Sequence, residues 1–139
     1  MKSKNINIVK EFLRHQSKGE LELALKHISD NAVWHTDSIE APWSGVHQGK
    51  PEIINHFKNI KASVLSFSKT TFDISGSDNH ALVYEYGLLK CQFAHNNQHF
   101  ESHIVSIYEI KMDKIHSYRV LENSLALHDS YHKLNGQEL

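Results

Sequence analysis

The chain has 139 residues, a length typical of one domain, with 15 basic residues, 16 acidic residues and a formal net charge of -1. Its 40% hydrophobic and 22% charged residues exclude a disordered or collagen-like chain. Without an excess of positive charge, no nucleic-acid partner is expected. No run approaches the ~18 apolar residues of a membrane span, so no membrane partner is expected either. These numbers predict a single soluble domain over residues 1–139.

Cysteine usage and the N-terminus bear on the compartment. The single cysteine, Cys91, cannot form an intrachain disulfide, which fits a reducing compartment. Lys10 and Glu11 interrupt the apolar run that an export signal would need after the basic N-terminus. We therefore expect a cytoplasmic protein. Its 12 histidines are scattered along the chain, and most are expected at the surface, where they would gain charge between pH 7 and pH 5.

Two helices are predicted in the N-terminal part. Residues 4–17 have apolar side chains at the three-and-four spacing of an amphipathic helix, namely Ile6, Val9, Phe12 and Leu13. Gly19 follows and favours the left-handed end of a helix. Residues 21–28 repeat the helical spacing over a shorter length, with Ile28 on the apolar side.

A short strand, a loop and a third helix are expected next. Residues 32–36 begin with apolar side chains and read as a strand. Residues 39–49 contain Pro and Gly and read as an irregular loop. Pro51 suits the first turn of a helix that extends to about residue 64.

The remainder of the chain changes to the two-residue period of strands. Four strands are predicted, over residues 67–74, 81–93, 99–112 and 115–123. The breaks between them are short and polar, which indicates an antiparallel meander. Helices followed by strands are typical of an α+β fold, with the helices on one face of a curved sheet.

Several motifs in this order resemble those of the NTF2-like superfamily: Phe12-Leu13 before Gly19-Glu20, Asp30-Asn31-Ala32-Val33-Trp34, Gly45-Val46-His47-Gln48-Gly49 leading to Ile53, and Lys114-Ile115 running to Glu122. The last motif resembles the SnoaL-like branch, which includes polyketide cyclases and lies close to ketosteroid isomerases. The resemblance covers the chain apart from the tail after about Leu127. It implies an NTF2-like (cystatin-like) conical barrel of about three helices on a mostly antiparallel sheet, with a pocket between them.

Strand alternation together with this resemblance predicts the lining of the pocket. Trp34 is expected to point inward, whereas Glu85 and His103 are expected to point outward. The predicted ligand-binding residues are Phe12, Trp34, Thr36, Phe57, Tyr84, Tyr86, Ser106, Tyr108, Tyr118 and Val120. Aromatic walls with a few polar groups are typical of a small-molecule site, so a small apolar or aromatic organic ligand is expected. The alternative is that these side chains fill the core.

Glu122 is the predicted catalytic residue. It falls where the resemblance to SnoaL-type cyclases implies an acid/base Asp on the last strand. Burial among Tyr and aliphatic side chains would favour its protonated form and suit proton transfer near neutral pH. The implied activity is that of a cofactor-independent cyclase, isomerase or dehydratase. The alternative is a carboxylate at the barrel rim, bonded to a neighbour such as Asn123.

A typical ketosteroid isomerase is not expected. Carried across by the resemblance, the general-base Asp falls on Thr36, and the donor Tyr of the first helix falls on Phe12. The protonated Asp donor falls on Ser106, and a further pocket Tyr falls on Phe57. Thr has no useful basicity and Phe cannot donate a hydrogen bond, so that mechanism would require Asp37 to replace the base.

Two histidine groups have spacings that bear on chemistry. His35 and Asp37 lie two apart on one strand, close enough to pair as an oriented base, or else simply at the surface. His128 and His132 have helical i, i+4 spacing, which supports at most adventitious metal binding. No metal site and no cofactor are predicted.

A homodimer is predicted from the outward-facing set of strand residues. Val105 and Ile107, with Val83 and Leu89 on the neighbouring strand, would leave an apolar patch in water. A second copy could cover this patch through a two-fold contact. The competing expectation is that the tail over residues 124–139 folds back over it. At the level of function, the rivals to an enzyme are a ligand carrier or sensor and a protein-interaction module.

Overall fold

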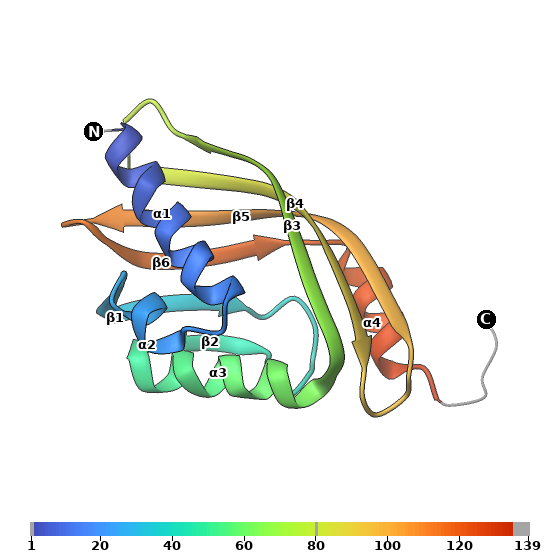
Figure 1. Ribbon diagram of the computed structural model, residues 1–139. Coiled ribbons are helices and arrows are strands. Elements are labelled where there is room, and N and C mark those ends of the chain that lie inside the picture. The colour runs from blue at the N-terminus through green and yellow to red at the C-terminus, as the bar shows by residue number, and fades with distance from the viewer. Residues whose placement is uncertain (1, 80, 135–139) are drawn as a thin grey trace.

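The computed structural model describes residues 2–79 and 81–134, and in this part of the chain it contains four helices and six strands (Figure 1). In chain order these are α1 (Lys2–Ser17), α2 (Leu21–Leu25), β1 (Ile28–Thr36), β2 (Gly45–Gln48), α3 (Gly49–Ser63), β3 (Val64–Gly76), β4 (Leu82–Phe93), β5 (His99–Lys111), β6 (Lys114–Leu121) and α4 (Ser124–His132). None of the helices described is long and apolar enough to cross a membrane.

The first helix covers nearly the same residues as its apolar spacing predicts. Val9 and Phe12 of α1 are buried in the core, and Gly19 follows the helix with a φ of +72°, which favours glycine. The second helix is shorter than expected, because Ile28 begins β1 instead of ending α2. Ile28 pairs with Ile115 of β6, so a contact distant in sequence decides its conformation.

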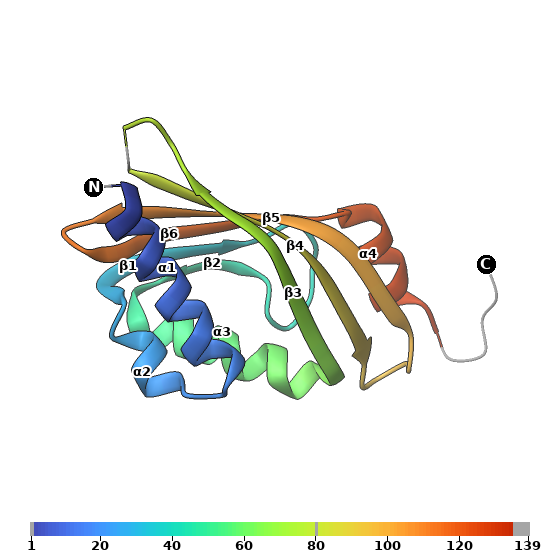
Figure 2. The same cartoon turned by 45° about the horizontal axis from the view of Figure 1, so that its top comes forward.

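The described strands form one mixed sheet in the order β2-β1-β6-β5-β4-β3. Strands β3 to β6 are consecutive antiparallel neighbours, which confirms the predicted meander, and β1 joins β6 in parallel. The sheet is open, with β2 and β3 at its edges. Helices α1, α2 and α3 lie on the same side of this curved sheet (Figure 2). The α+β architecture expected from the element order is confirmed.

Part of the segment expected to be an irregular loop is a strand. β2 pairs antiparallel with β1, with Val46 opposite His35. Hydrogen bonding to an existing strand, which local composition does not reveal, stabilises the extended backbone here. The loop prediction over residues 39–49 is therefore wrong for Gly45–Gln48.

The segment after the last strand is a helix at the far end of the sheet. Asn123 caps α4, since its side-chain oxygen accepts a hydrogen bond of 3.1 Å from the backbone N–H of Ala126. Leu127 of α4 packs with Phe93 and Phe100 in a second core cluster. This position overturns the alternative that the tail covers the outward strand residues Val105 and Ile107, at least through residue 134.

The predicted phase of β5 is confirmed. Ser106 and Tyr108 are fully buried and Ile104 is nearly so, whereas His103 is exposed. The buried set faces the main core between the sheet and the helices. That core comprises Val9, Phe12, Ala24, Ile28, Ala32, Trp34, Ile53, Val83, Tyr108, Ile110 and Ile115.

The predicted phase of β4 is wrong. Val83 and Glu85 are fully buried, with Glu85 opposite Ser106 in the register, whereas Tyr86 is 45% exposed and lies opposite Val105. Both alternating sets of this strand contain apolar side chains, so the sequence pattern does not distinguish its two faces. Tyr84 and Tyr86, which were predicted to point inward, share the face that points away from the core.

Candidate functional site

Five aromatic residues predicted to line a pocket form one cluster against the concave side of the sheet. Trp34 stacks on Tyr118 with ring centroids 4.6 Å apart, and it meets Phe12 and Phe57 edge-on at 5.9 and 6.0 Å. Tyr108 lies 6.2 Å from Phe12 and 5.3 Å from Tyr118. The rings pack against one another, in the arrangement that the core-filling alternative predicts.

The three smaller predicted lining residues have separate surroundings. Ser106 is fully buried, with its hydroxyl 3.4 Å from the Tyr118 hydroxyl. Thr36 donates a hydrogen bond of 3.2 Å to the Trp43 carbonyl oxygen. Val120 is half-buried and lines a separate cleft.

Tyr84 and Tyr86 lie on the opposite side of the sheet from Trp34. Tyr86 stacks on His103 with ring centroids 5.7 Å apart, and its hydroxyl lies 2.9 Å from His103 Nδ1. Tyr84 has the same orientation, because alternate residues of a strand share a face. The prediction that both tyrosines converge with Trp34 and Glu122 is wrong, for the same reason that the phase of β4 is wrong.

A cleft of about 180 Å³ lies beside the end of β6. It is lined by residues from β1 and the following loop, from β6 and from the start of α4: His35, Asp37, Ser38, Arg119, Val120, Leu121, Glu122 and Ser124. Pockets for drug-sized ligands measure ~300–1,000 Å³. The cleft therefore fits a small molecule or one end of a larger one.

Glu122 contributes a carboxylate to this cleft. Its Oε1 accepts a hydrogen bond from the Ser38 hydroxyl, and the Ser124 hydroxyl lies 3.5 Å from the same oxygen. Its Oε2 is buried and has no hydrogen-bond partner among the described residues. Removing an ionised oxygen from water without a partner is costly, so this atom is available to accept a hydrogen bond from a ligand.

His35 and Asp37 line the same cleft as Glu122. The sequence suggested two separate constellations on two strands, which the parallel pairing of β1 with β6 brings together. In this register His35 lies opposite Arg119. Arg119 is exposed and supplies a permanent positive charge to the lining of the cleft.

Glu85, predicted to point outward, is fully buried in the core. Its Oε1 accepts hydrogen bonds from the Tyr108 hydroxyl at 2.9 Å and from Lys69 Nζ at 3.2 Å, and its Oε2 accepts one from the Thr71 hydroxyl at 2.6 Å. Three donors, one of them charged, offset the cost of burying the carboxylate. Sequence reasoning missed this group by placing a charged residue in water. Lys69 and Thr71, two apart on the preceding strand, were the available signal.

The two buried tyrosine hydroxyls are held in their protonated forms. Burial raises the pKa of Tyr108 well above its ordinary value, and the charge of Glu85 raises it further. Burial also raises the pKa of Tyr118, to which the charges of Glu85 and Glu122 add. Tyr118 is thus within electrostatic reach of both carboxylates.

Two histidines fix the loop that precedes β2. His56 Nδ1 lies 2.7 Å and His47 Nε2 lies 2.9 Å from the carbonyl oxygen of Trp43, so both ring nitrogens act as donors. Burial lowers the pKa of His56 to about 4, and the nearby His47 contributes. His56 is only 2% exposed, so it is an exception to the expectation that most histidines lie at the surface. The same loop carries Ser38, the partner of Glu122.

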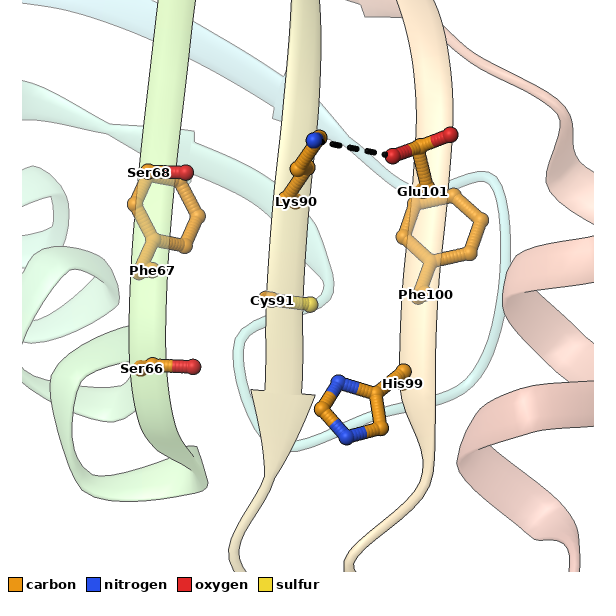
Figure 3. A pocket seen from close by; sticks show the side chains of 8 residues that line it. All are labelled: Ser66, Phe67, Ser68, Lys90, Cys91, His99, Phe100 and Glu101. Carbon is orange, nitrogen blue, oxygen red and sulfur yellow. Dashed lines mark ion pairs between the residues drawn. The ribbon is translucent and has the colours of Figure 1, made fainter.

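A second depression, of about 340 Å³, lies over β3, β4 and β5 (Figure 3). Its lining consists of Ser66, Phe67, Ser68, Lys90, Cys91, His99, Phe100 and Glu101. Lys90 and Glu101 form an ion pair across neighbouring strands, with Nζ and Oε1 3.3 Å apart. Both side chains are exposed, and they alternate with the buried Cys91 and Phe100. The lining therefore includes side chains from both alternating sets of these strands.

The described part of the chain gives little support for metal binding or for thiol chemistry. It contains no group of three or more His, Cys, Asp or Glu side chains placed to hold a metal ion. His128 and His132 do share one side of α4, with ring centroids 4.5 Å apart. Burial raises the pKa of the Cys91 thiol to about 11, which disfavours the reactive thiolate.

Comparison with solved structures identifies the fold. No protein-family model and no curated protein sequence matches this chain. An NTF2-like protein from Burkholderia xenovorans superimposes with a TM-score of 0.82 at 19% identity, over 95% of this chain and 98% of that one. TerC, co-crystallised with polyporic acid, gives 0.81 at 11% identity, over 94% and 99%. A putative SnoaL-like polyketide cyclase from Jannaschia sp. gives 0.79 at 9% identity, over 94% and 93%.

These likenesses confirm the NTF2-like fold that the sequence motifs indicated. At identities below 20% they are similarities of fold, and this fold is compatible with many functions. A functional conclusion must therefore come from the side chains of the site.

Proposed function

We propose that the chain binds a small polar organic ligand in the cleft beside Glu122, and that Glu122 exchanges a proton with this ligand without a cofactor. The buried Glu122 Oε2 carries the proposal, because it has no hydrogen-bond partner among the described residues. Ser38 holds Oε1 and so fixes the direction of the carboxylate. A positioned carboxylate with one free oxygen is suited to general acid–base catalysis.

The charges of the cleft favour a particular class of ligand. Arg119 matches a carboxylate or a developing oxyanion, since its guanidinium donates paired hydrogen bonds to such groups. Glu122 would remove a proton from the carbon next to a carbonyl group, the C–H electrons would form the enolate, and Arg119 would stabilise the enolate oxygen. Return of the proton to another carbon or oxygen completes an isomerisation. Small carbonyl compounds that carry a carboxylate fit these requirements.

This ligand is more polar than the one expected from the sequence. Phe12, Trp34 and Tyr118 were predicted to hold an apolar or aromatic ligand, but their rings contact one another, whereas the cleft is lined by charged and hydroxyl groups. For an aromatic ligand to bind among them, these rings would have to separate. That TerC was co-crystallised with polyporic acid is compatible with ligand binding on this fold.

Hydrogen–deuterium exchange tests the activity. Pyruvate, oxaloacetate and dihydroxyacetone would be incubated with the protein in D2O, and loss of the C–H signals next to the carbonyl would be followed by NMR. We expect faster exchange for at least one of the two acids than for dihydroxyacetone. Glu122→Gln should abolish the enhancement, whereas Arg119→Gln should weaken binding of the acids. Leu125→Ala, which alters an exposed residue of α4 outside the cleft, is the control.

The rival reading is a carrier or sensor with the same site. Amide chemical shifts of the cleft residues on addition of pyruvate, without any enhanced exchange, would favour that reading and contradict catalysis. If neither shifts nor exchange depend on Glu122 or Arg119, the proposed site is wrong.

A further inference from the structure

Two histidines of α4 present their rings side by side at the end of the sheet. His128 and His132 are one helical turn apart, and their ring centroids lie 4.5 Å apart at an interplanar angle of 50°. Both side chains are exposed, so a solute can reach them. Two zinc–nitrogen bonds of ~2.0–2.1 Å at a tetrahedral angle hold their nitrogens ~3.4 Å apart. Rings at the observed spacing can present one nitrogen each at that separation without a change in the backbone.

Two hydrogen bonds decide which nitrogen of each ring carries the lone pair. His128 Nδ1 lies 3.4 Å from Asp129 Oδ1, and an ionised carboxylate only accepts, so Nδ1 is protonated and Nε2 is not. His132 Nε2 lies 3.2 Å from the backbone oxygen of Glu40, which also only accepts, so in this ring Nδ1 is the unprotonated nitrogen. Neither unprotonated nitrogen has a hydrogen-bond partner in the described part of the chain. Each ring therefore has one nitrogen ready to bind a cation.

The same two bonds resemble the outer shell of a metal site. A histidine ligand usually donates its second ring nitrogen to a carboxylate or a backbone carbonyl, which fixes the tautomer and makes the ligating nitrogen more basic. Asp129 accepts from His128 in this way, and the Glu40 carbonyl accepts from His132. The charge of Asp129 offsets that of Lys133, the C-cap of the helix. His132 lies in the last turn of α4, where the helix dipole favours a cation.

The end of α4 that carries His132 is held in place by a buried amide. Asn96, in the connection between β4 and β5, is only 3% exposed. Its Nδ2 lies 2.8–3.1 Å from three carbonyl oxygens at the end of the helix, those of Ser130, Tyr131 and Lys133. Carbonyls at this end of a helix have no partner within the helix, so the contact with Asn96 prevents fraying. Because the backbone is already fixed, a bound ion would order little more than the two rings.

We propose that His128 and His132 bind a divalent first-row transition-metal ion. His128 Nε2 and His132 Nδ1 are the protein ligands, and water occupies the remaining positions. Imidazole suits copper, nickel and zinc, whereas magnesium and calcium prefer oxygen ligands. The i, i+4 spacing by itself supports at most adventitious binding. The complementary tautomers and the fixed helix end are the additional features that make this pair a preorganised chelate.

The ion would also strengthen the contact between α4 and the segment that precedes β2. Coordination at His132 Nδ1 draws electron density from the ring, so its Nε2–H becomes a stronger donor to the Glu40 carbonyl. A ligand that binds only the folded chain stabilises it in proportion to the logarithm of the ligand concentration. The temperature of unfolding should therefore rise as zinc chloride is added.

The ligand atoms are tested without any metal. Nitrogen NMR of the histidine rings at pH 8, well above the ordinary pKa of ~6.5, should show the Nδ1–H tautomer for His128 and the Nε2–H tautomer for His132. Addition of zinc chloride should then shift His128 Nε2 and His132 Nδ1 before any other histidine nitrogen. The opposite tautomers, or first shifts at other histidines, would overturn the proposal.

Calorimetric titration with zinc chloride and nickel chloride tests the chelate. His128→Gln and His132→Gln should each weaken binding by roughly tenfold or more, because the second ligand then no longer binds within the same molecule. His99→Gln, which changes an exposed histidine of β5, should bind as the wild type does. Magnesium chloride should give no binding heat. Circular dichroism without metal would confirm that each variant is folded.

A variant with exchanged residues separates a chelate from a mere abundance of histidine. His132→Lys combined with Lys133→His keeps the composition and charge of the chain, but it moves the second imidazole off the side of α4 that carries His128. We expect this variant to lose as much affinity as His132→Gln, and its unfolding temperature should no longer respond to zinc chloride. Wild-type affinity in the exchanged variant, or in His128→Gln, would mean an adventitious ion only and would overturn the proposal.

Discussion

Tyr108 donates a hydrogen bond of 2.9 Å to Glu85 in the interior of the sheet, and neither side chain is exposed to solvent. The pair lies between adjacent strands. Lys69 and Thr71 of β3 donate the other hydrogen bonds to the carboxylate. One buried charge therefore connects three neighbouring strands. Such networks are strongly destabilised when one donor is lost, because the charge remains buried.

Removal of the Thr71 hydroxyl tests this network. Thr71→Ala leaves Glu85 Oε2 without its donor, so we expect a loss of about 1–2 kcal/mol in the free energy of unfolding. Thr70→Ala is the matched control. It loses the same strand propensity, but the Thr70 side chain points to the opposite side of β3. Urea denaturation would measure both. Equal losses in the two variants would show that the bond to Glu85 does not stabilise the sheet.

His56 should make the stability dependent on pH. Burial lowers its pKa to about 4 from the ordinary value of 6.5, so the unfolded chain binds a proton before the folded chain does. Stability should be fully present above pH 6.5 and fall by about 3 kcal/mol as the pH decreases toward 4.

His56→Gln isolates this contribution. Glutamine keeps a donor for the Trp43 carbonyl but does not titrate in this range. Thermal unfolding between pH 7 and pH 4.5 should therefore show a shallower decrease for the variant than for the wild type. His99→Gln, which changes an exposed histidine, should retain the wild-type slope. Parallel curves for His56→Gln and the wild type would contradict the assignment.

Gly87 should not tolerate a side chain. A Cβ at this position would lie 2.4 Å from the backbone oxygen of Thr70, so the pairing of β3 with β4 must shift to admit it. We expect Gly87→Ala to cost about 2 kcal/mol or more, as overpacking against backbone does. Gly19→Ala should cost only about 1 kcal/mol, because it meets no atom within 4 Å and only its φ of +72° is unfavourable. Denaturation curves that rank the two in the reverse order would contradict this explanation.

Glu122→Gln should not destabilise the protein. The buried Oε2 has no partner among the described residues, so replacing the charge with an amide removes a desolvation cost. We expect stabilisation of about 0.5–2 kcal/mol, together with loss of the proposed activity, as is common when a site is kept for function. Differential scanning calorimetry at pH 7 would measure the change. A strongly destabilised variant would show that Glu122 is a structural carboxylate.

Much of the fold could be predicted because its signals are local. The apolar spacing in residues 4–17 and the period of two after residue 67 depend on neighbours in the sequence. Where long-range pairing decides the conformation, local patterns were insufficient. Ile28 joins β1 and Val46 joins β2 because strands distant in sequence supply their hydrogen-bond partners.

The sequence predicted several residues of the candidate site but not how they are arranged in space. Glu122, His35 and Asp37 were each singled out from the sequence, yet only the parallel pairing of β1 with β6 places them around one cleft with Arg119. No spacing along the chain encodes that neighbourhood, since it joins segments more than eighty residues apart.

The sequence by itself determined the element order and the helix faces, because each rests on a periodic pattern. The inward set of β5 was predicted together with the family resemblance, since both alternating sets of this strand mix polar and apolar side chains. Only the tertiary structure decided the orientation of β4, whose two sides are both largely apolar. It buried Glu85 and exposed Tyr86, against the usual preference of each side chain. The physical reason is that donors from Lys69, Thr71 and Tyr108 converge on Glu85 only after three strands have aligned.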